Sequence, residues 1–131
     1  MEYREEDVGT KVRLAGAWAT LIALYIYADF LSLYPGQLGE ISRGALGPFD
    51  VSQVTLLISS LIVILPALMI VLSLILPRAI SRSVNLVLAV LYVLINISNL
   101  IGETWVYYLL FGVIEILITV FIFFLAWRWQ P

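Results

Sequence analysis

The sequence predicts an all-α integral membrane protein, folded as an antiparallel four-helix bundle. Of its 131 residues 63% are apolar and only 12% are charged, with a mean hydropathy of +1.06. A soluble domain is about 45–50% apolar and about a quarter charged, and could not hide this much hydrocarbon without large adhesive patches. Lipid is therefore the expected solvent. The length predicts one domain, residues 1–131, without a separate soluble catalytic module.

Four apolar runs predict the four helices: Leu14–Leu33, Val54–Leu76, Val84–Ile101 and Trp105–Trp127. Each has about the 17–25 residues that a helix needs to cross a hydrocarbon core about 30 Å thick. The runs are continuously apolar and do not alternate, and an open sheet cannot satisfy its backbone in lipid, so strands are excluded. The first run is longer than a signal peptide, follows the acidic leader MEYREED, and has no A-x-A site after it.

The basic residues predict the orientation. The N-terminal tail, the loop between the second and third runs, and the C-terminus carry six of them, whereas the other two loops carry only Arg43. Cytoplasmic loops are enriched in Lys and Arg, so both termini are predicted to be cytoplasmic, in the inner (cytoplasmic) membrane of a cell. The six are Arg4, Lys11, Arg13, Arg78, Arg82 and Arg128.

The three connections differ in length and composition. The outer loop, residues 34–53, is rich in Gly and Pro, and a loop of this length is usually functional or partly structured, so we expect a short interfacial helix around 37–46. The middle loop, PRAISRS, is short and basic, and attraction to anionic inner-leaflet lipid is its simplest interpretation. The last connection, around Gly102–Thr104, is expected to be a tight turn.

Polar residues recur at helical spacing on every run. Polar side chains avoid lipid and turn inward in a membrane bundle, so these stripes predict a polar seam between the helices. The stripes are Trp18, Tyr25, Asp29 and Ser32; Ser59, Pro66 and Ser73; Asn85, Ala89, Tyr92, Asn96 and Asn99; and Tyr108, Gly112, Glu115 and Thr119.

Depth along the runs places most of these polar groups in the outer half. Asp29 lies about 6 Å below the outer end of its helix and Glu115 lies near the midplane. Ionisable groups in the membrane are costly and are by default functional-site hypotheses. The predicted pocket therefore has Asp29 at its rim and Glu115 at its floor, whereas the inner half, with runs such as VFIFFLA, is expected to be nearly featureless. The candidate ligand-binding residues are Asp29, Glu115, Tyr25, Asn96, Asn99, Ser59, Tyr92 and Tyr108.

A purely structural interpretation of the same residues stays open. Asp29 could accept hydrogen bonds from Tyr25 and an asparagine and so hold neighbouring helices together, and the Asn96/Asn99 pair could also form such interhelical hydrogen bonds. Pro66 is expected to kink its helix and free a carbonyl group. No Lys or Arg lies at membrane depth, so the two acids need Tyr, Ser, Asn, water, a bound cation or their own protons as partners.

The missing residue types narrow the chemistry. The chain has no Cys and no His, which removes disulfides, thiol nucleophiles, imidazole-ligated haem and the usual zinc sites. We predict no metal site, no cofactor and no catalytic residue, although two carboxylates could hold a hard cation. No basic patch supports nucleic-acid binding.

Four stretches of the chain stand out together: KVRLAGAW, LYIYADFLSLYPGQL, LPALMIVLSLILP and FGVIEILIT. They resemble a family of small prokaryotic four-span membrane proteins that is catalogued as a domain of unknown function, and the resemblance covers nearly the whole chain. The family is loosely similar to DoxX-like proteins in size and topology. The resemblance implies a four-span fold and brings no activity with it.

Two functions follow as the main alternatives. In the first, the outward-facing pocket binds a proton, a cation or a small polar or lipid ligand. In the second, the protein is a structural or accessory subunit of a membrane complex, and the seam serves only helix packing. An enzyme acting on a lipid or quinone through the two carboxyl groups is less favoured, because no nucleophile or cofactor motif is present. Besides the bilayer, a second copy of the chain or a membrane protein is the expected partner.

Overall fold

The computed structural model describes residues 5–32, 45–46, 49–50 and 52–129, and the side chains of residues 8–31 and 52–129. Helices α1 (Glu5–Ser32), α3 (Gln53–Ile75), α4 (Arg78–Leu100) and α5 (Val106–Trp127) account for most of it. All four are long and apolar enough to cross a membrane. The predicted all-α membrane bundle is confirmed, and the chain is a multi-pass membrane protein.

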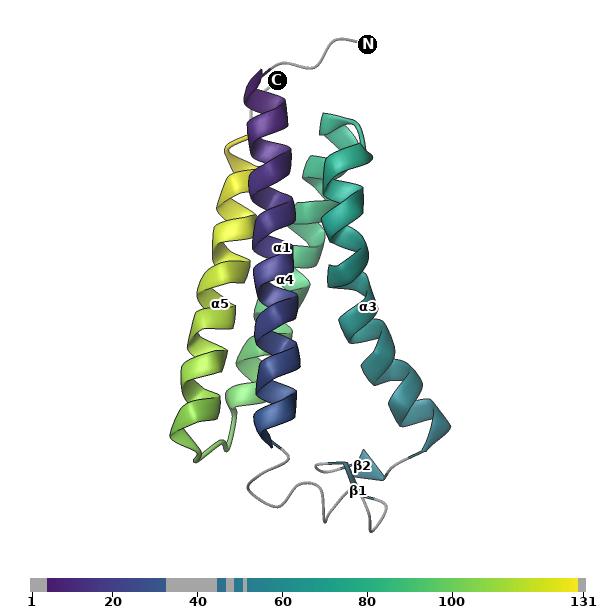
Figure 1. Cartoon of the computed structure of the whole chain (residues 1–131), viewed down its shortest axis with the longest axis vertical. Helices are drawn as coiled ribbons and strands as arrows, with labels where there is room; N and C mark the ends of the chain where they lie inside the picture. The colour runs from purple at the N-terminus through teal and green to yellow at the C-terminus, as the bar shows by residue number, and fades with distance from the viewer. Residues whose placement is uncertain (1–4, 33–44, 47–48, 51, 130–131) are drawn as a thin grey trace.

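The helices run alternately up and down, so α1 begins and α5 ends at the same end of the bundle (Figure 1). We call this the termini end, and the opposite end, with the α1–α3 connection and the α4–α5 turn, the loop end. Helix α1 packs against both α3 and α5, and α5 packs against α4. Helices α3 and α4 are consecutive in the chain but meet only sparsely, and α3 diverges from α1 toward the loop end (Figure 1).

Local sequence signals set the helix boundaries. Ser52 caps α3 by accepting a hydrogen bond from the backbone N–H of Thr55 at 3.1 Å. Pro77 separates α3 from α4, because proline is favoured at a helix start and cannot continue the helix before it. After α4 the chain reverses through Gly102, whose φ of +79° lies in the left-handed region that glycine adopts without penalty. The predicted tight turn at Gly102–Thr104 is thus present.

Two helices extend beyond the apolar runs that predicted them. Helix α1 begins at Glu5 and α4 at Arg78, several residues before Leu14 and Val84. A helical backbone continues through polar residues where water replaces lipid, so hydropathy marks the span and not the whole helix.

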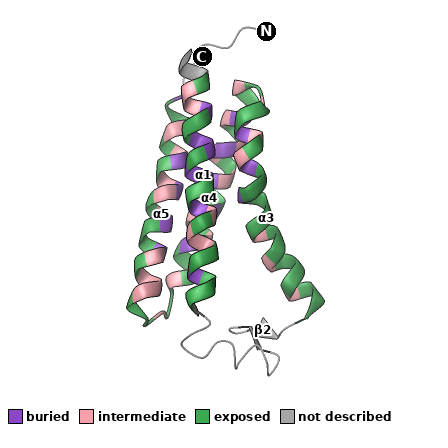
Figure 2. Cartoon of the chain, viewed as in Figure 1, coloured by how far each residue is buried: buried purple, intermediate pink, exposed green. Residues whose placement is uncertain are grey.

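Each helix turns one stripe inward, in which successive positions lie three or four residues apart. An average spacing of about 3.5 residues is typical of left-handed helix bundles, because it keeps the same side of each helix turned toward its neighbours. Figure 2 shows the buried positions on the facing sides of the helices, with exposed residues outward. The exposed large side chains are mainly Leu, Ile, Val and Phe, as expected for a surface that contacts lipid.

Pro66 interrupts the hydrogen-bond ladder of α3. It is buried inside the helix and, having no N–H, cannot bond to the carbonyl of Ile62 four residues earlier. The Tyr92 hydroxyl of α4 donates to that carbonyl oxygen at 2.6 Å. The prediction that Pro66 frees a carbonyl is confirmed, and the free acceptor is satisfied from the neighbouring helix.

The termini-end half contains a buried polar cluster, so the expectation of a nearly featureless inner half is wrong. The Trp18 indole N–H donates to Asn85 Oδ1 at 2.7 Å, and Asn85 Nδ2 donates to the carbonyl of Ser81 at 2.8 Å. Ser73 Oγ lies 3.4 Å from the same amide. These four side chains are fully buried and join α1, α3 and α4.

Most of the expected interfacial helix around 37–46 lies outside the described residues. Its last two residues form a short antiparallel pair instead, β1 (Ala45–Leu46) with β2 (Phe49–Asp50). The helix therefore does not extend through Leu46.

Candidate functional site: an acidic cavity at the loop end

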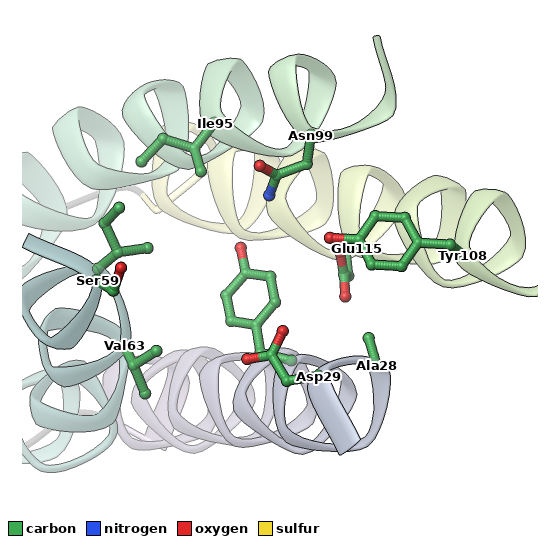
Figure 3. Close-up of a pocket in the computed structure, with 10 residues that line it drawn as sticks. Ala28, Asp29, Ser59, Val63, Ile95, Asn99, Tyr108 and Glu115 are labelled. Atoms are coloured by element: carbon green, nitrogen blue, oxygen red, sulfur yellow. The ribbon is translucent and has the colours of Figure 1, made fainter. Parts of the chain in front are cut away.

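A cavity of about 180 Å³ lies between the four helices in the loop-end half. Every helix contributes to its wall (Figure 3). Six of the eight residues predicted from the sequence line it: Tyr25, Asp29, Ser59, Asn99, Tyr108 and Glu115. The structure thus brings together polar residues that are up to ninety positions apart in the chain.

Glu115 is the most buried acid in this cavity. It lies near the middle of α5 and keeps only 5% of its surface exposed. Its Oε2 atom is buried and has no hydrogen-bond partner among the described residues. A buried polar atom without a partner costs about 1–3 kcal/mol, and more when the group is charged. The arrangement therefore leaves an acceptor in the cavity wall that the bundle does not satisfy.

Asp29 occupies the cavity nearer the end of α1, three residues before the helix terminates. Unlike Glu115 it is exposed, as expected for a residue where the cavity opens. Figure 3 shows its carboxyl group directed into the space that Glu115 faces from the other side. The two acids therefore stand at different depths of one cavity, the arrangement expected of a rim and a floor.

Tyr25 lines the cavity while its hydroxyl is committed to the bundle. It donates to Asn96 Oδ1 of α4. The orientation of the Asn96 amide is fixed by its other side, because Nδ2 lies 3.4 Å from the carbonyl oxygen of Glu115, which can only accept. Oδ1 therefore faces Tyr25, and the tyrosine hydroxyl must donate. The Tyr25 hydroxyl can therefore only accept a hydrogen bond from a group in the cavity.

The remaining two predicted residues are buried behind the cavity and do not line it. Asn96 lies in a network that includes Thr119, whose hydroxyl is 3.5 Å from Asn96 Nδ2 and also contacts the Glu115 carbonyl at 3.0 Å. Tyr92 is held by the Ile62 carbonyl described above. For these two residues the geometry matches the structural interpretation left open by the sequence.

The polar residues that line the cavity differ in how far they are satisfied. No hydrogen bond of the Ser59, Asn99 or Tyr108 side chain is seen within residues 8–31 and 52–129, and none of the Asp29 carboxyl group. Asn99 is exposed, in contrast to the fully buried Asn96 one turn earlier. Of the Asn96/Asn99 pair, Asn96 therefore serves helix packing and Asn99 lines the cavity.

Electrostatically the cavity is acidic. No Lys or Arg among the described residues lines it, and the basic side chains that the structure describes, Lys11, Arg13, Arg78, Arg82 and Arg128, all belong to the termini end. Across the described chain no group of three or more Asp, Glu, His or Cys side chains could hold a metal ion. The chemistry available is a pair of carboxyl groups, phenol and amide groups, and an apolar wall.

Sequence reasoning missed two parts of this region. The apolar wall includes Ala28, Ile62, Val63 and Ile95, which look like ordinary lipid-facing residues in a membrane helix. The cluster around Asn85 was also missed, although Asn85 and Ser73 were recognised on their stripes. Their closeness could have been read from the short Pro77 turn, across which the residues are only twelve positions apart.

Comparison with protein families supports the resemblance seen in the sequence. The model of a family of unknown function, DUF6326, matches residues 1–131. The chain belongs to this family. DUF6326 carries no assigned activity, so membership in it adds support to the fold and none to a reaction. Neither a curated protein nor a solved structure matches the chain.

Proposed function

We propose that the cavity binds a small cationic ligand that donates hydrogen bonds, such as a hydrated monovalent cation or a primary amine. The observation that carries this proposal is the buried Glu115 Oε2, which has no hydrogen-bond partner among the described residues and belongs to a side chain that lines the same cavity as Asp29. Two carboxyl groups that have no basic neighbour within residues 8–31 and 52–129 are accommodated at membrane depth by protons or by an external cation.

The hydrogen-bond inventory favours a donor as the ligand. Both carboxylates accept, and the Tyr25 hydroxyl can only accept because its proton is committed to Asn96. A cavity of about 180 Å³ suits a few waters or one small organic cation and not a lipid headgroup with its chains. By the predicted orientation the cavity opens on the outer side of the membrane.

A thermal-stability titration in detergent tests this proposal. The protein is titrated with sodium, potassium and methylammonium chloride, with tetramethylammonium as the matched ligand that has the charge but no N–H donor. Methylammonium or one of the metal cations is expected to raise the midpoint of unfolding in a saturable way, because a ligand that binds only the folded state stabilises it. Tetramethylammonium is expected to have no such effect.

Three variants locate the effect. Glu115→Gln and Asp29→Asn should abolish the stabilisation while the protein stays folded. Glu103→Gln is the matched control, because it removes one carboxylate outside the cavity and keeps the Oε1 acceptor that binds the N–H groups of Thr104 and Trp105. The proposal fails if no cation stabilises the wild-type protein, or if Glu115→Gln and Asp29→Asn respond like Glu103→Gln.

An accessory or structural role is the second candidate. It is supported by the networks around Asn85 and Asn96, in which polar seam residues pair inside the chain. Native mass spectrometry from gentle detergent distinguishes the two, because an accessory subunit is expected to keep a stoichiometric membrane partner. Transport of the ligand would require a second copy of the chain, since four helices enclose little aqueous space, and a strictly monomeric particle would argue against transport.

A further inference from the structure

We propose that a groove between the start of α1 and the end of α5 binds one anionic phospholipid, with its phosphate on two arginines and an acyl chain on two phenylalanines. The groove has a volume of about 510 Å³ and lies at the termini end, away from the acidic cavity. Its wall is formed by Thr10, Arg13, Phe121, Phe124, Leu125, Arg128 and Trp129.

The charged part of the groove is suited to a phosphate group. Arg13 lies on α1 and Arg128 caps the C-terminal end of α5, and both line the same space, so both guanidinium groups can approach one anion. Both residues are exposed, and neither guanidinium makes a salt bridge or hydrogen bond within the described side chains. Among the side chains that the structure describes, no acidic one lines the groove, and the Thr10 hydroxyl adds a donor beside Arg13.

The apolar part continues from the arginine toward the bilayer centre. Phe124 lies four residues before Arg128 and Phe121 seven before it, so all three share one face of α5. Phe121 is 49% and Phe124 is 50% exposed, which leaves both rings available to an acyl chain. Charged groups at the interface above aromatic groups at hydrocarbon depth match the two ends of a phospholipid, whereas a free phosphate would use only the upper half.

Other basic residues at this end are less suited to the same ligand. Arg82 donates through Nη2 to the Trp127 carbonyl at 3.2 Å and lies over the Trp127 ring, 5.8 Å from its centroid. Arg82 therefore links α4 to α5. Arg78 begins α4 and does not line the groove. By the predicted orientation the groove faces the inner leaflet, which carries the anionic lipids.

Lipid retention in native mass spectrometry tests the proposal. Delipidated protein is incubated with dioleoylphosphatidylglycerol or dioleoylphosphatidylcholine, which have the same chains. Wild-type protein is expected to retain one phosphatidylglycerol in preference to phosphatidylcholine, and excess glycerol phosphate should not displace it. Arg13→Gln and Arg128→Gln should each reduce this preference about fivefold, whereas the charge-matched control Arg78→Gln should leave it within about twofold.

Three outcomes would overturn the proposal. They are equal retention of both lipids by the wild-type protein, displacement by glycerol phosphate, or an effect of Arg78→Gln as large as those of the groove variants, which would indicate general attraction to this end. A photoreactive phosphatidylglycerol provides a second measurement on unaltered protein, so the test does not depend on the variants folding. Crosslinks within 10–13 or 121–129 support the groove, and crosslinks confined to 78–82 contradict it.

Discussion

The Tyr92 hydroxyl replaces the backbone hydrogen bond that Pro66 removes from Ile62. It donates to the Ile62 carbonyl at 2.6 Å, and so couples α3 beside Pro66 to the middle of α4. Helices α3 and α4 otherwise meet sparsely, so this bond is a principal link between them.

Tyr92→Phe is therefore expected to lower the free energy of unfolding by about 1–3 kcal/mol, because it leaves the part-buried Ile62 carbonyl unsatisfied. In a Pro66→Ala background the new N–H can bond to Ile62, and the cost of Tyr92→Phe should fall below about 1 kcal/mol. Reversible unfolding in detergent measures all four proteins of the cycle. The exposed Tyr27→Phe serves as control, within about 0.5 kcal/mol of wild type. Equal costs in both backgrounds would contradict the coupling.

Asn85→Ala should destabilise the bundle by about 1–3 kcal/mol, because it leaves the Trp18 indole N–H without its acceptor in a fully buried site. Asn99→Ala makes the same change on the same helix at an exposed position with no hydrogen bond among the described residues, and should cost less than about 0.5 kcal/mol. Near-ultraviolet circular dichroism should also change in Asn85→Ala. Equal effects of the two substitutions would show that the Asn85 cluster contributes no stability.

Two glycine substitutions should act in opposite directions. Gly102→Ala forces a side chain onto a φ of +79°, and should destabilise by about 1–2 kcal/mol through the backbone alone, since no atom lies within 4 Å of the added Cβ. Gly16→Ala also meets no neighbour but lies within α1, and should stabilise by up to about 1 kcal/mol. Thermal unfolding midpoints suffice to read the sign. A loss of stability in Gly16→Ala would indicate a contact on that face of α1 in the membrane or detergent.

Replacing Glu115 by leucine should not destabilise the ligand-free protein and is expected to stabilise it by about 1 kcal/mol, because it removes a buried acceptor that has no partner in the described part of the chain. Asn96→Leu is the comparison: its amide is satisfied on both sides, so the substitution should cost about 1–3 kcal/mol. Both are measured without added cation. A large loss of stability in Glu115→Leu would mean that the carboxyl group holds the bundle together, which favours the accessory role over ligand binding.

The fold could be predicted from the sequence because lipid imposes a simple rule on it. Every span must be a helix, and the few polar residues must turn inward, so the stripe that contains Tyr108, Gly112, Glu115 and Thr119 identifies the inner face of α5 directly. The grouping of Asp29 with Glu115 follows from the same rule together with depth. Neither requires knowledge of which helices are neighbours.

The individual partners could not be predicted, because they depend on the azimuth and height of each helix relative to the others. Trp18 meets Asn85 across 67 positions, and Asn96 is buried while Asn99, on the same stripe, is exposed. Tyr92 lies on the same stripe of α4 as Asn99, which lines the cavity. Its hydroxyl nevertheless donates to the Ile62 carbonyl that Pro66 leaves free, because the two groups lie at the same depth in the bundle. Hydropathy could not predict that α4 begins at Arg78, because the apolar pattern ends where the helix leaves the lipid.

The hydrogen bond from Tyr25 to Asn96 makes cavity occupancy and helix association thermodynamically reciprocal. Tyr25 forms part of the cavity wall, and Asn96, outside the cavity, connects it to the backbone of α5. A ligand that accepts a hydrogen bond from the Tyr25 hydroxyl would break the bond from Tyr25 to Asn96 Oδ1. A ligand that donates a hydrogen bond to Tyr25 would strengthen it. By linkage, breaking the Tyr25–Asn96 hydrogen bond changes the affinity for the ligand by the same factor by which bound ligand changes the equilibrium for breaking that bond.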